Sequence, residues 1–120
     1  MRRIAVVDDN AVNRRLVKAM VKRLYELDEY EDGPTALAGI AQSPPELVLL
    51  DISLPGMDGV EVLRRIREEP RFAEIPVIAM TAHALVGDRE RFLKEGFDDY
   101  IGKPMVDIPA VMEQIARHLG

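Results

Sequence analysis

Short apolar runs that alternate with helical periodicities are the feature that most limits how this chain can fold. Three runs rich in β-branched residues have the length and composition of buried strands, at 4–7, 47–50 and 75–80. Two weaker strands are predicted at 26–30, where polar residues indicate a sheet edge, and at 100–101. Strands that alternate with helices form parallel sheets covered on both faces, so the pattern predicts an α/β fold with right-handed crossovers.

The segments between these runs carry the spacing and capping signals of helices. The first helix is predicted from apolar residues at intervals of four, namely Val12, Leu16, Met20 and Leu24. Asp58 and Glu61 predict a capping box at the start of the third helix. Pro34 and Gly96 stand where a first-turn proline and a C-cap glycine belong, and Asp107 precedes the last helix.

Five strand–helix units fit within a chain of 120 residues, the size of one domain, which we expect to span residues 1–120. With 48% apolar residues, the chain can bury a core without disulfides or a structural metal. Five parallel strands in this length predict the flavodoxin-like order 2-1-3-4-5.

The composition excludes several classes of function. No cysteine is present, which excludes thiol catalysis, Cys-ligated zinc and disulfide frameworks and fits a cytoplasmic protein. A net charge of -5, with basic residues interleaved among acids, argues against direct binding to nucleic acid. No apolar run is long enough to cross a bilayer, and the run after Arg3 is too short for a signal peptide, so no membrane contact is expected.

Acidic residues stand at the ends of two predicted strands: Asp8 and Asp9 follow the first run and Asp51 the third. In a doubly wound sheet these ends lie together where the connections diverge, and ligands bind there. Carboxylates this close repel by about 4 kcal/mol per pair at an effective dielectric near 20, so a cation is needed to offset them. An all-oxygen cluster with open positions suits Mg²⁺, with Mn²⁺ as an alternative, better than copper or zinc.

Two further strand ends bring a hydroxyl and an ammonium group to the same edge. Thr81 follows the fourth run and Lys103 the fifth, and a lysine suits a phosphoryl oxygen or a carboxylate. Taken singly, each feature has an ordinary explanation: a helix N-cap, a strand-forming threonine, a lysine in a loop. Together, at successive strand ends, they predict a phosphoryl-transfer pocket with a metal, a nucleophile and two groups that hold the incoming charge.

The motifs around these residues resemble response-regulator receivers of two-component signalling. The similar stretches are IAVVDDN at 4–10, LLDISLPGMDG at 49–59, Thr81-Ala82 and Lys103-Pro104, so the resemblance covers essentially the whole chain. The stretch 8–16, with Asn10 and Asn13-Arg14, is most similar to hybrid-kinase receivers and single-domain cell-cycle regulators.

The resemblance implies a phosphorelay function and a role for each acid. Asp51 would accept a phosphoryl group from a histidine kinase or a histidine phosphotransfer protein. Asp9 and Asp51 would ligate Mg²⁺ directly, with the backbone carbonyl of Ser53, and Asp8 would act mainly through a metal-bound water. The chain would then be no enzyme in the usual sense, because it would catalyse only its own phosphorylation and slow dephosphorylation.

The resemblance also implies a switch. Thr81 would hydrogen-bond the new phosphoryl group, Lys103 would pair with it, and the Lys103–Pro104 peptide bond would be cis. Tyr100 would turn inward as Thr81 moves, so that one modification biases two packings of one surface. The alternative for Tyr100 is a half-buried aromatic at the sheet edge with its hydroxyl in water.

Partners are expected to meet two surfaces. Val17 and Val21 would widen the apolar face of the first helix toward solvent and help to dock the phosphodonor, with ordinary core packing as the alternative. The helix 86–95, the strand at Tyr100 and the last helix would pass the signal to an unknown downstream protein. A monomer or a weak phosphorylation-dependent dimer is expected.

Four residues depart from the family pattern or sit at tuning positions. Leu24 and Tyr30 replace a glycine and a small residue, so a distortion of the second strand and its flanking loop is expected. His83 would tune access of water to the acyl phosphate, or simply face solvent. His118 suits the dipole at the end of the last helix and needs no other role.

Three other functions compete with a phosphorylated receiver. An aspartyl-phosphate phosphatase would carry a second aspartate two residues after the nucleophile, where this chain has Ser53, and a cap insertion that it lacks. A receiver that works unphosphorylated would be expected to have a broken pocket. A flavin binder of the flavodoxin type would need a phosphate-cradling loop after the first strand, where Asp8 and Asp9 would repel a phosphate.

Overall fold

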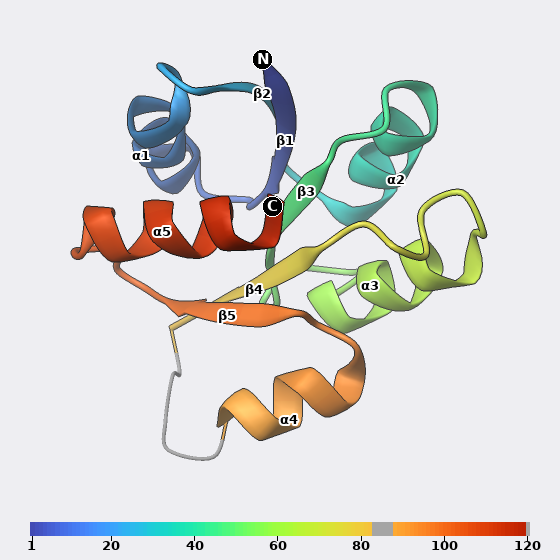
Figure 1. The fold of residues 1–120 in the computed structure, drawn as a ribbon. Coiled ribbons are helices and arrows are strands. Elements are labelled where there is room, and N and C mark those ends of the chain that lie inside the picture. The colour runs from blue at the N-terminus through green and yellow to red at the C-terminus, as the bar shows by residue number, and fades with distance from the viewer. Residues whose placement is uncertain (83–87, 120) are drawn as a thin grey trace.

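The structure, a computed structural model, describes residues 1–82 and 88–119 of the chain. One parallel sheet runs through its middle in the order β2-β1-β3-β4-β5, which confirms the predicted order (Figure 1). The strands are β1 (Arg2–Val7), β2 (Tyr25–Tyr30), β3 (Leu47–Asp51), β4 (Val77–Thr81) and β5 (Asp99–Gly102).

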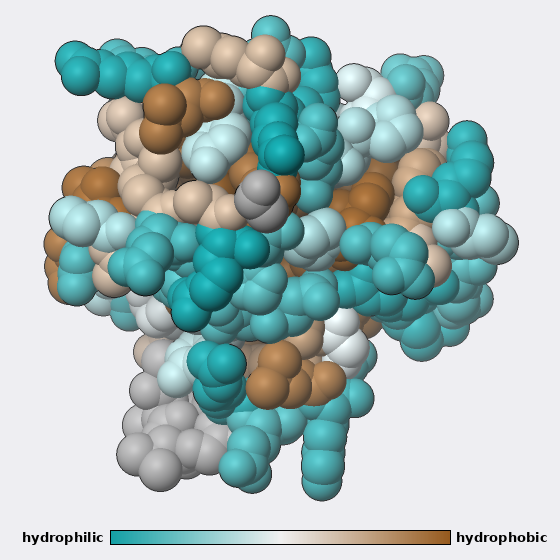
Figure 2. Space-filling model, viewed as in Figure 1, coloured by the Kyte–Doolittle hydropathy of each residue, from teal (hydrophilic) through white to brown (hydrophobic). Residues whose placement is uncertain are grey.

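Helices cover both faces of this sheet. On one face lie α1 (Ala11–Val21) and α5 (Ile108–Leu119), and on the other α2 (Gly33–Gln42), α3 (Gly59–Glu68) and α4 (Asp88–Glu95) (Figure 1). Hydrophilic residues cover most of the visible outer face, including α5 across its centre (Figure 2). Among the described residues, no helix has the length and apolar character needed to cross a membrane.

The strands divide the apolar core into two layers because successive side chains point to opposite faces. In β1, Ile4 and Val6 pack with the layer under α1 and α5. Ala5 and Val7 pack with the layer under α2, α3 and α4. All four are fully buried, which explains why the central strands read as continuous apolar runs.

Most predicted strand and helix signals are confirmed, with shifted ends. The Asp58 side chain accepts a hydrogen bond of 2.9 Å from the Glu61 backbone N–H, although the Glu61 carboxylate itself pairs with Arg64 and Arg65. Gly96 adopts a φ of 110° after α4, which favours glycine. The fourth strand begins at Val77 rather than residue 75.

The apolar stripe of α1 differs from the predicted one. Val17 and Val21 are fully buried against the sheet, whereas Val12 is 65% and Leu24 61% exposed. A four-residue spacing drifts around a helix of 3.6 residues per turn, and Leu24 lies beyond the end of α1, so the ends of the predicted stripe leave the sheet. The prediction that Val17 and Val21 dock a partner is therefore wrong, and they are core residues.

The expected distortion of β2 is also absent. All six residues of β2 pair with β1 in a regular parallel register, from Arg2 with Tyr25 to Val7 with Tyr30. The bulk of Tyr30 is instead accommodated by α2, because its ring lies against Gly39, where a side-chain Cβ would overlap the ring atoms. A large residue on the strand is matched by a missing side chain on the helix.

This match predicts that Gly39→Ala destabilises the protein although alanine is the better helix former. The added methyl group would displace the Tyr30 ring, and we expect a loss of about 1–3 kcal/mol in the free energy of unfolding. In a Tyr30→Ala background the clash is gone, and the same change should stabilise by about 0.5–1 kcal/mol. Urea unfolding of the four proteins measures both changes, and a loss in both backgrounds would contradict the proposed contact.

Candidate functional site

The three predicted acids meet at the carboxyl end of the sheet. β1 and β3 are paired neighbours, so Asp8 and Asp9 after β1 lie next to Asp51 at the end of β3. One carboxylate oxygen from each residue lies within 4.8 Å of the others. Asp8 and Asp51 are buried, whereas Asp9 is exposed. The cluster is therefore closed on its protein side and open through Asp9.

Backbone and side-chain hydrogen bonds build the loop between β1 and α1. The Asp8 N–H donates to the carbonyl of Tyr30 at 3.0 Å, and the Asn10 N–H donates to Asp8 Oδ1 at 2.9 Å. The Asn10 side chain then caps α1 by accepting from the N–H groups of Val12 and Asn13. The helix cap is thus Asn10, and the preceding acids are left to form the cluster.

The loop after Asp51 depends on a glycine that the sequence analysis did not single out. The Ser53 N–H donates to Asp51 Oδ1 at 2.9 Å, and the Gly59 N–H donates to the Ile52 carbonyl at 3.3 Å. A Cβ on Gly59 would lie 2.5 Å from the Asp51 carbonyl oxygen. Only glycine lets α3 begin this close to the end of β3. The sequence contains a signal for this close approach, because glycine is a poor helix former and yet occupies the first helical position.

Lys103 reaches the acids from the end of β5. Its Nζ lies 2.9 Å from Asp51 Oδ2 and 3.2 Å from Asp8 Oδ2. Burial by itself lowers the pKa of Lys103, but the hydrogen bond and charge of Asp51, together with those of Asp8, outweigh it and raise the pKa above 10.5. The ammonium group therefore stays charged at neutral pH and offsets the repulsion between the two buried carboxylates.

Thr81 ends β4 between these groups. Met80, the residue before it, pairs with Asp51 in the sheet, and Thr81 itself pairs with Gly102. The Lys103 N–H donates to the Thr81 carbonyl at 2.7 Å, and the Lys103–Pro104 peptide bond is cis. The structure thus brings together the three acids and Lys103 and places Thr81 at the end of the strand between β3 and β5, whereas His83 lies outside the described residues.

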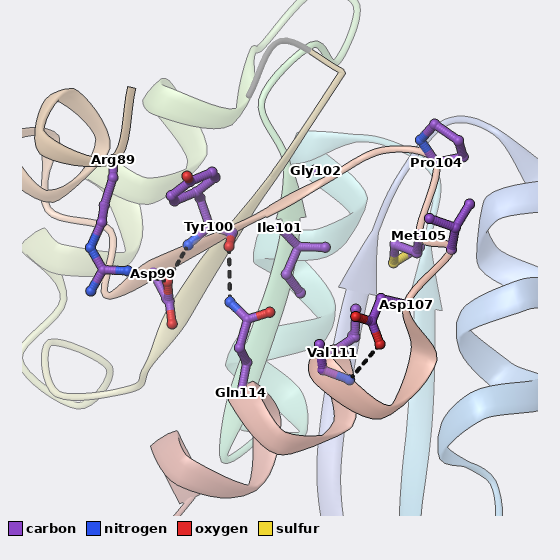
Figure 3. Close-up of a pocket in the computed structure, with 12 residues that line it drawn as sticks. Arg89, Asp99, Tyr100, Ile101, Gly102, Pro104, Met105, Asp107, Val111 and Gln114 are labelled. Atoms are coloured by element: carbon purple, nitrogen blue, oxygen red, sulfur yellow. Dashed lines mark hydrogen bonds and ion pairs between the residues drawn. The ribbon is translucent and has the colours of Figure 1, made fainter. Parts of the chain in front are cut away.

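Tyr100 is half-buried beside α4, with its ring 5.9 Å from the ring of Phe92. Tyr100 also lines a pocket of about 310 Å³ (Figure 3). Two hydrogen bonds hold its main chain there. The Tyr100 N–H donates to Asp99 Oδ1 at 2.8 Å, and Gln114 Nε2 donates to the Tyr100 carbonyl at 3.0 Å. The backbone of β5 is therefore coupled to α5 through Gln114.

His118 has a partner that the sequence analysis did not expect. Its Nε2 lies 3.0 Å from Oδ2 of Asp99, a buried carboxylate. Burial raises the pKa of Asp99, but hydrogen bonds from His118, the Tyr100 N–H and Gln114 outweigh burial and leave the pKa below 3.8. The prediction that His118 needs no role beyond the helix dipole is wrong, because it links α5 to β5.

The donor set at the acid cluster fits a hard divalent cation. Its protein ligands are carboxylate oxygens, and the exposed side at Asp9 leaves room for water, which Mg²⁺ retains in protein sites. Neither nitrogen nor sulfur ligands are among the clustered groups, which disfavours zinc and copper. Lys103 already neutralises part of the acidic charge, so a bound ion would share the carboxylates with the ammonium group.

Comparison with known proteins finds a family and close relatives. A family model described as the response regulator receiver domain matches residues 4–116. The chain is 43% identical over 107 residues to the response regulator PleD of Caulobacter vibrioides, covering 88% of this chain and 24% of PleD. It is 36% identical over 118 residues to the polar-differentiation response regulator DivK of Brucella anthropi, covering 98% of this chain and 95% of DivK. The chain thus spans about a quarter of PleD and nearly all of DivK.

A solved structure adds a metal to the comparison. The receiver domain of a sensor histidine kinase from Pseudomonas aeruginosa is 34% identical to this chain and superposes with a TM-score of 0.88. The match covers 99% of this chain and 98% of that one. That protein was crystallised with a magnesium ion coordinated in its active-site cleft.

Proposed function

This chain belongs to the response regulator receiver domain family, and on that premise we propose that Asp51 accepts a phosphoryl group with Mg²⁺ and that the protein signals by binding another protein. One observation carries the proposal: Lys103 Nζ lies 2.9 Å from the buried carboxylate of Asp51, within an acid cluster that is open to solvent through Asp9. That contact supplies a nucleophile and, beside it, a fixed cation to receive the charge of a phosphoryl group.

In the transfer, an Asp51 carboxylate oxygen would attack the phosphorus of a phosphohistidine on the partner. The P–O bond forms as the P–N bond breaks, and the histidine nitrogen leaves with the electron pair and takes up a proton. Lys103 would move from the carboxylate to a phosphoryl oxygen, and the Thr81 hydroxyl would donate to another. Mg²⁺, held by Asp9, Asp51 and the carbonyl of Ser53, would offset negative charge on the transferring group.

Asp8 fits a role in the outer shell of the ion. It is fully buried, its Oδ1 accepts from the Asn10 N–H and its Oδ2 lies 3.2 Å from Lys103 Nζ. With both oxygens engaged, Asp8 would act through a metal-bound water, while the exposed Asp9 can ligate directly. Manganese, another oxygen-preferring ion, could replace magnesium.

Phosphorylation of Asp51 would change the surface formed by α4, β5 and α5 through movements of Thr81 and Tyr100. A hydroxyl drawn toward the phosphoryl group would vacate space next to β5, and the half-buried Tyr100 ring could fill it. The surface formed by α4, β5 and α5 would then bind the downstream protein. The hydrogen bonds from Gln114 and to Asp99 would keep the strand in place while the ring moves.

Uptake of phosphate from a small donor tests the proposed function. Incubation of the full chain with acetyl phosphate and Mg²⁺ should add the mass of one phosphoryl group, and excess EDTA should prevent it. The adduct should be released by hydroxylamine, as expected of an acyl phosphate, and should map to the peptide that contains Asp51. Failure to take up phosphate from acetyl phosphate or phosphoramidate, with Mg²⁺ or Mn²⁺, would leave a module that binds its partners unphosphorylated.

The phosphodonor would dock on exposed apolar residues beside the pocket. Val12 follows Asp9 by three residues and Val106 follows Lys103 by three, and their exposed fractions are 65% and 83%. Both therefore border the strand ends that carry the pocket, as a surface for the helices of a histidine kinase or a histidine phosphotransfer protein must. These residues take the place of Val17 and Val21, which are buried.

Val12→Lys is expected to slow phosphotransfer from a histidine-containing donor protein about tenfold or more, because an apolar contact is lost and a charge must be desolvated. Phosphorylation by acetyl phosphate should stay within about twofold of wild type, since that donor needs no docking surface. Leu24→Lys is a matched control, because Leu24 is equally exposed and lies beyond the opposite end of α1. Equal slowing with both donors would contradict docking at Val12.

A further inference from the structure

We propose that Arg14 is a positioning residue for the metal-binding acids, an inference that rests on the proposed function. Arg14 lies in α1 and its side chain is 18% exposed. Its Nη1 donates a hydrogen bond of 2.6 Å to the backbone carbonyl oxygen of Asp8. On its other side, Arg14 Nε lies 3.5 Å from Oε1 of Glu29 in β2.

The contact with Asp8 controls where Asp9 stands. The peptide unit is planar, so the direction of the Asp8 carbonyl sets the plane that also carries the amide nitrogen and Cα of Asp9. A charge-assisted hydrogen bond from a guanidinium group holds that plane more firmly than a neutral donor would. Arg14 thus orients the exposed acid of the cluster through the backbone, without touching a carboxylate of the site.

Two further hydrogen bonds hold Asp8 itself. The Asp8 N–H donates to the Tyr30 carbonyl, and the Asp8 side chain accepts from the Asn10 N–H. Neither bond restrains the Asp8 carbonyl. Glu29, on the same strand as Tyr30, holds the guanidinium group in turn, so that α1, β2 and the acid loop are tied together through Arg14.

Charge and positioning make opposite predictions for metal binding. Arg14 is a cation near a divalent-ion site, so its charge alone repels the ion, and its removal would tighten Mg²⁺ binding. Loss of the hydrogen bond to Asp8 would let Asp9 move away from the ligand geometry and would weaken binding. Removal of an outer-shell partner typically costs about 10–100-fold in metal affinity. The direction of the change in Kd therefore separates the two roles.

The test compares Arg14→Met with Arg15→Met by calorimetric titration of the full chain with Mg²⁺. Arg15 is the next residue on α1 and is exposed, and no hydrogen bond or ion pair is described for it within 1–82 and 88–119. We expect the Kd for Mg²⁺ to rise about tenfold in Arg14→Met and to stay within about twofold in Arg15→Met. Arg14→Lys, which retains the charge but not the fork of donors, should fall between wild type and Arg14→Met.

Phosphorylation kinetics supply a second measurement. In Arg14→Met, the Mg²⁺ concentration that gives half-maximal phosphorylation by acetyl phosphate should rise with the Kd. The rate at saturating Mg²⁺ should stay within about twofold of wild type, because Asp51 and Lys103 are untouched. Urea unfolding in EDTA reports separately any loss of stability, which a purely structural role would produce without a change in Kd.

The outcomes are distinguishable. An unchanged or lower Kd in Arg14→Met overturns the positioning role, and a lower maximal rate at unchanged half-saturation does the same. If Arg14→Met does not fold, Arg14→Lys decides, and a Kd equal to that of wild type overturns the inference. If the wild-type chain itself binds no Mg²⁺, the proposed function fails and this inference falls with it.

Discussion

Asp51→Asn is expected to abolish phosphate uptake from acetyl phosphate in the presence of Mg²⁺, where the wild-type chain should take up one phosphoryl group. An amide oxygen is a far weaker nucleophile than a carboxylate, and the change also removes one proposed ligand of the ion. The fold should survive, because asparagine can still accept the hydrogen bond from the Ser53 N–H and Lys103 keeps its contact with Asp8. Intact-mass spectrometry measures the result.

Asp58→Asn is the matched control for this variant. Asp58 lies seven residues farther along, is exposed and caps α3 by accepting from the Glu61 N–H. Asparagine caps helices as well as aspartate does, so phosphate uptake should equal that of wild type. Phosphate uptake by Asp51→Asn at the wild-type level would assign the acceptor to another residue.

Arg67→Met is expected to cause the largest loss of stability, about 2–4 kcal/mol in the free energy of unfolding. The Arg67 side chain, in α3, is 24% exposed and donates four hydrogen bonds to the segments that precede β4 and β5. Its acceptors are the carbonyl oxygens of Ala73 (3.1 Å), Ile75 (2.6 Å) and Gly96 (3.1 Å) and the Asp98 carboxylate (2.8 Å). Methionine can fill the space but removes the donor from the three carbonyl oxygens, whereas the Asp98 carboxylate keeps the Val77 N–H.

Arg64→Met is the control on the same helix. Arg64 is 59% exposed and forms ion pairs with Glu61 and Glu68 at the helix surface. Exposed pairs of this kind contribute little, so the free energy of unfolding should change by no more than about 0.5–1 kcal/mol. Urea unfolding of both variants in EDTA gives the comparison. Equal losses would mean that the Arg67 network is no stronger than a surface ion pair.

The fold was predictable because its signals are local. Three of the five strands are predicted from apolar runs rich in β-branched residues, β2 from a weaker and largely polar stretch, and β5 from a single pair of residues. Strand ends shifted by up to two residues, as at Val77, where Pro76 has no N–H to donate and the chain is still in the turn closed by the Ile75 N–H. Sheet order followed from the alternation of strands and helices together with chain length.

The pocket was predictable for a related reason. Each of the predicted site residues ends a strand or follows one within two residues, namely Asp8, Asp9, Asp51, Thr81 and Lys103. In a parallel sheet the carboxyl ends of neighbouring strands lie at one edge, so position along the chain translates into position in space. Their roles in phosphorylation stay predictions until the variants above are measured.

Contacts between elements were not predictable in the same way. Periodicity predicts an apolar stripe on α1, but which residues face the sheet depends on where the helix begins and how it lies on β1 and β2. The sequence predicts that Tyr30 distorts β2, because only the tertiary structure shows that its ring packs against Gly39 on α2. His118 finds Asp99, and Arg14 finds the Asp8 carbonyl, through packing of segments that are separate in sequence.

The α/β class, the strand order and the set of polar groups gathered at the sheet edge all follow from the amino-acid sequence. Each of these depends on short stretches of the chain and on the geometry common to all parallel sheets. Tertiary structure alone decided which face of α1 is buried, how the acid loop is held and which arginine binds neighbouring segments together. Those outcomes depend on distances between side chains and backbone groups far apart in sequence, and no local pattern specifies such distances.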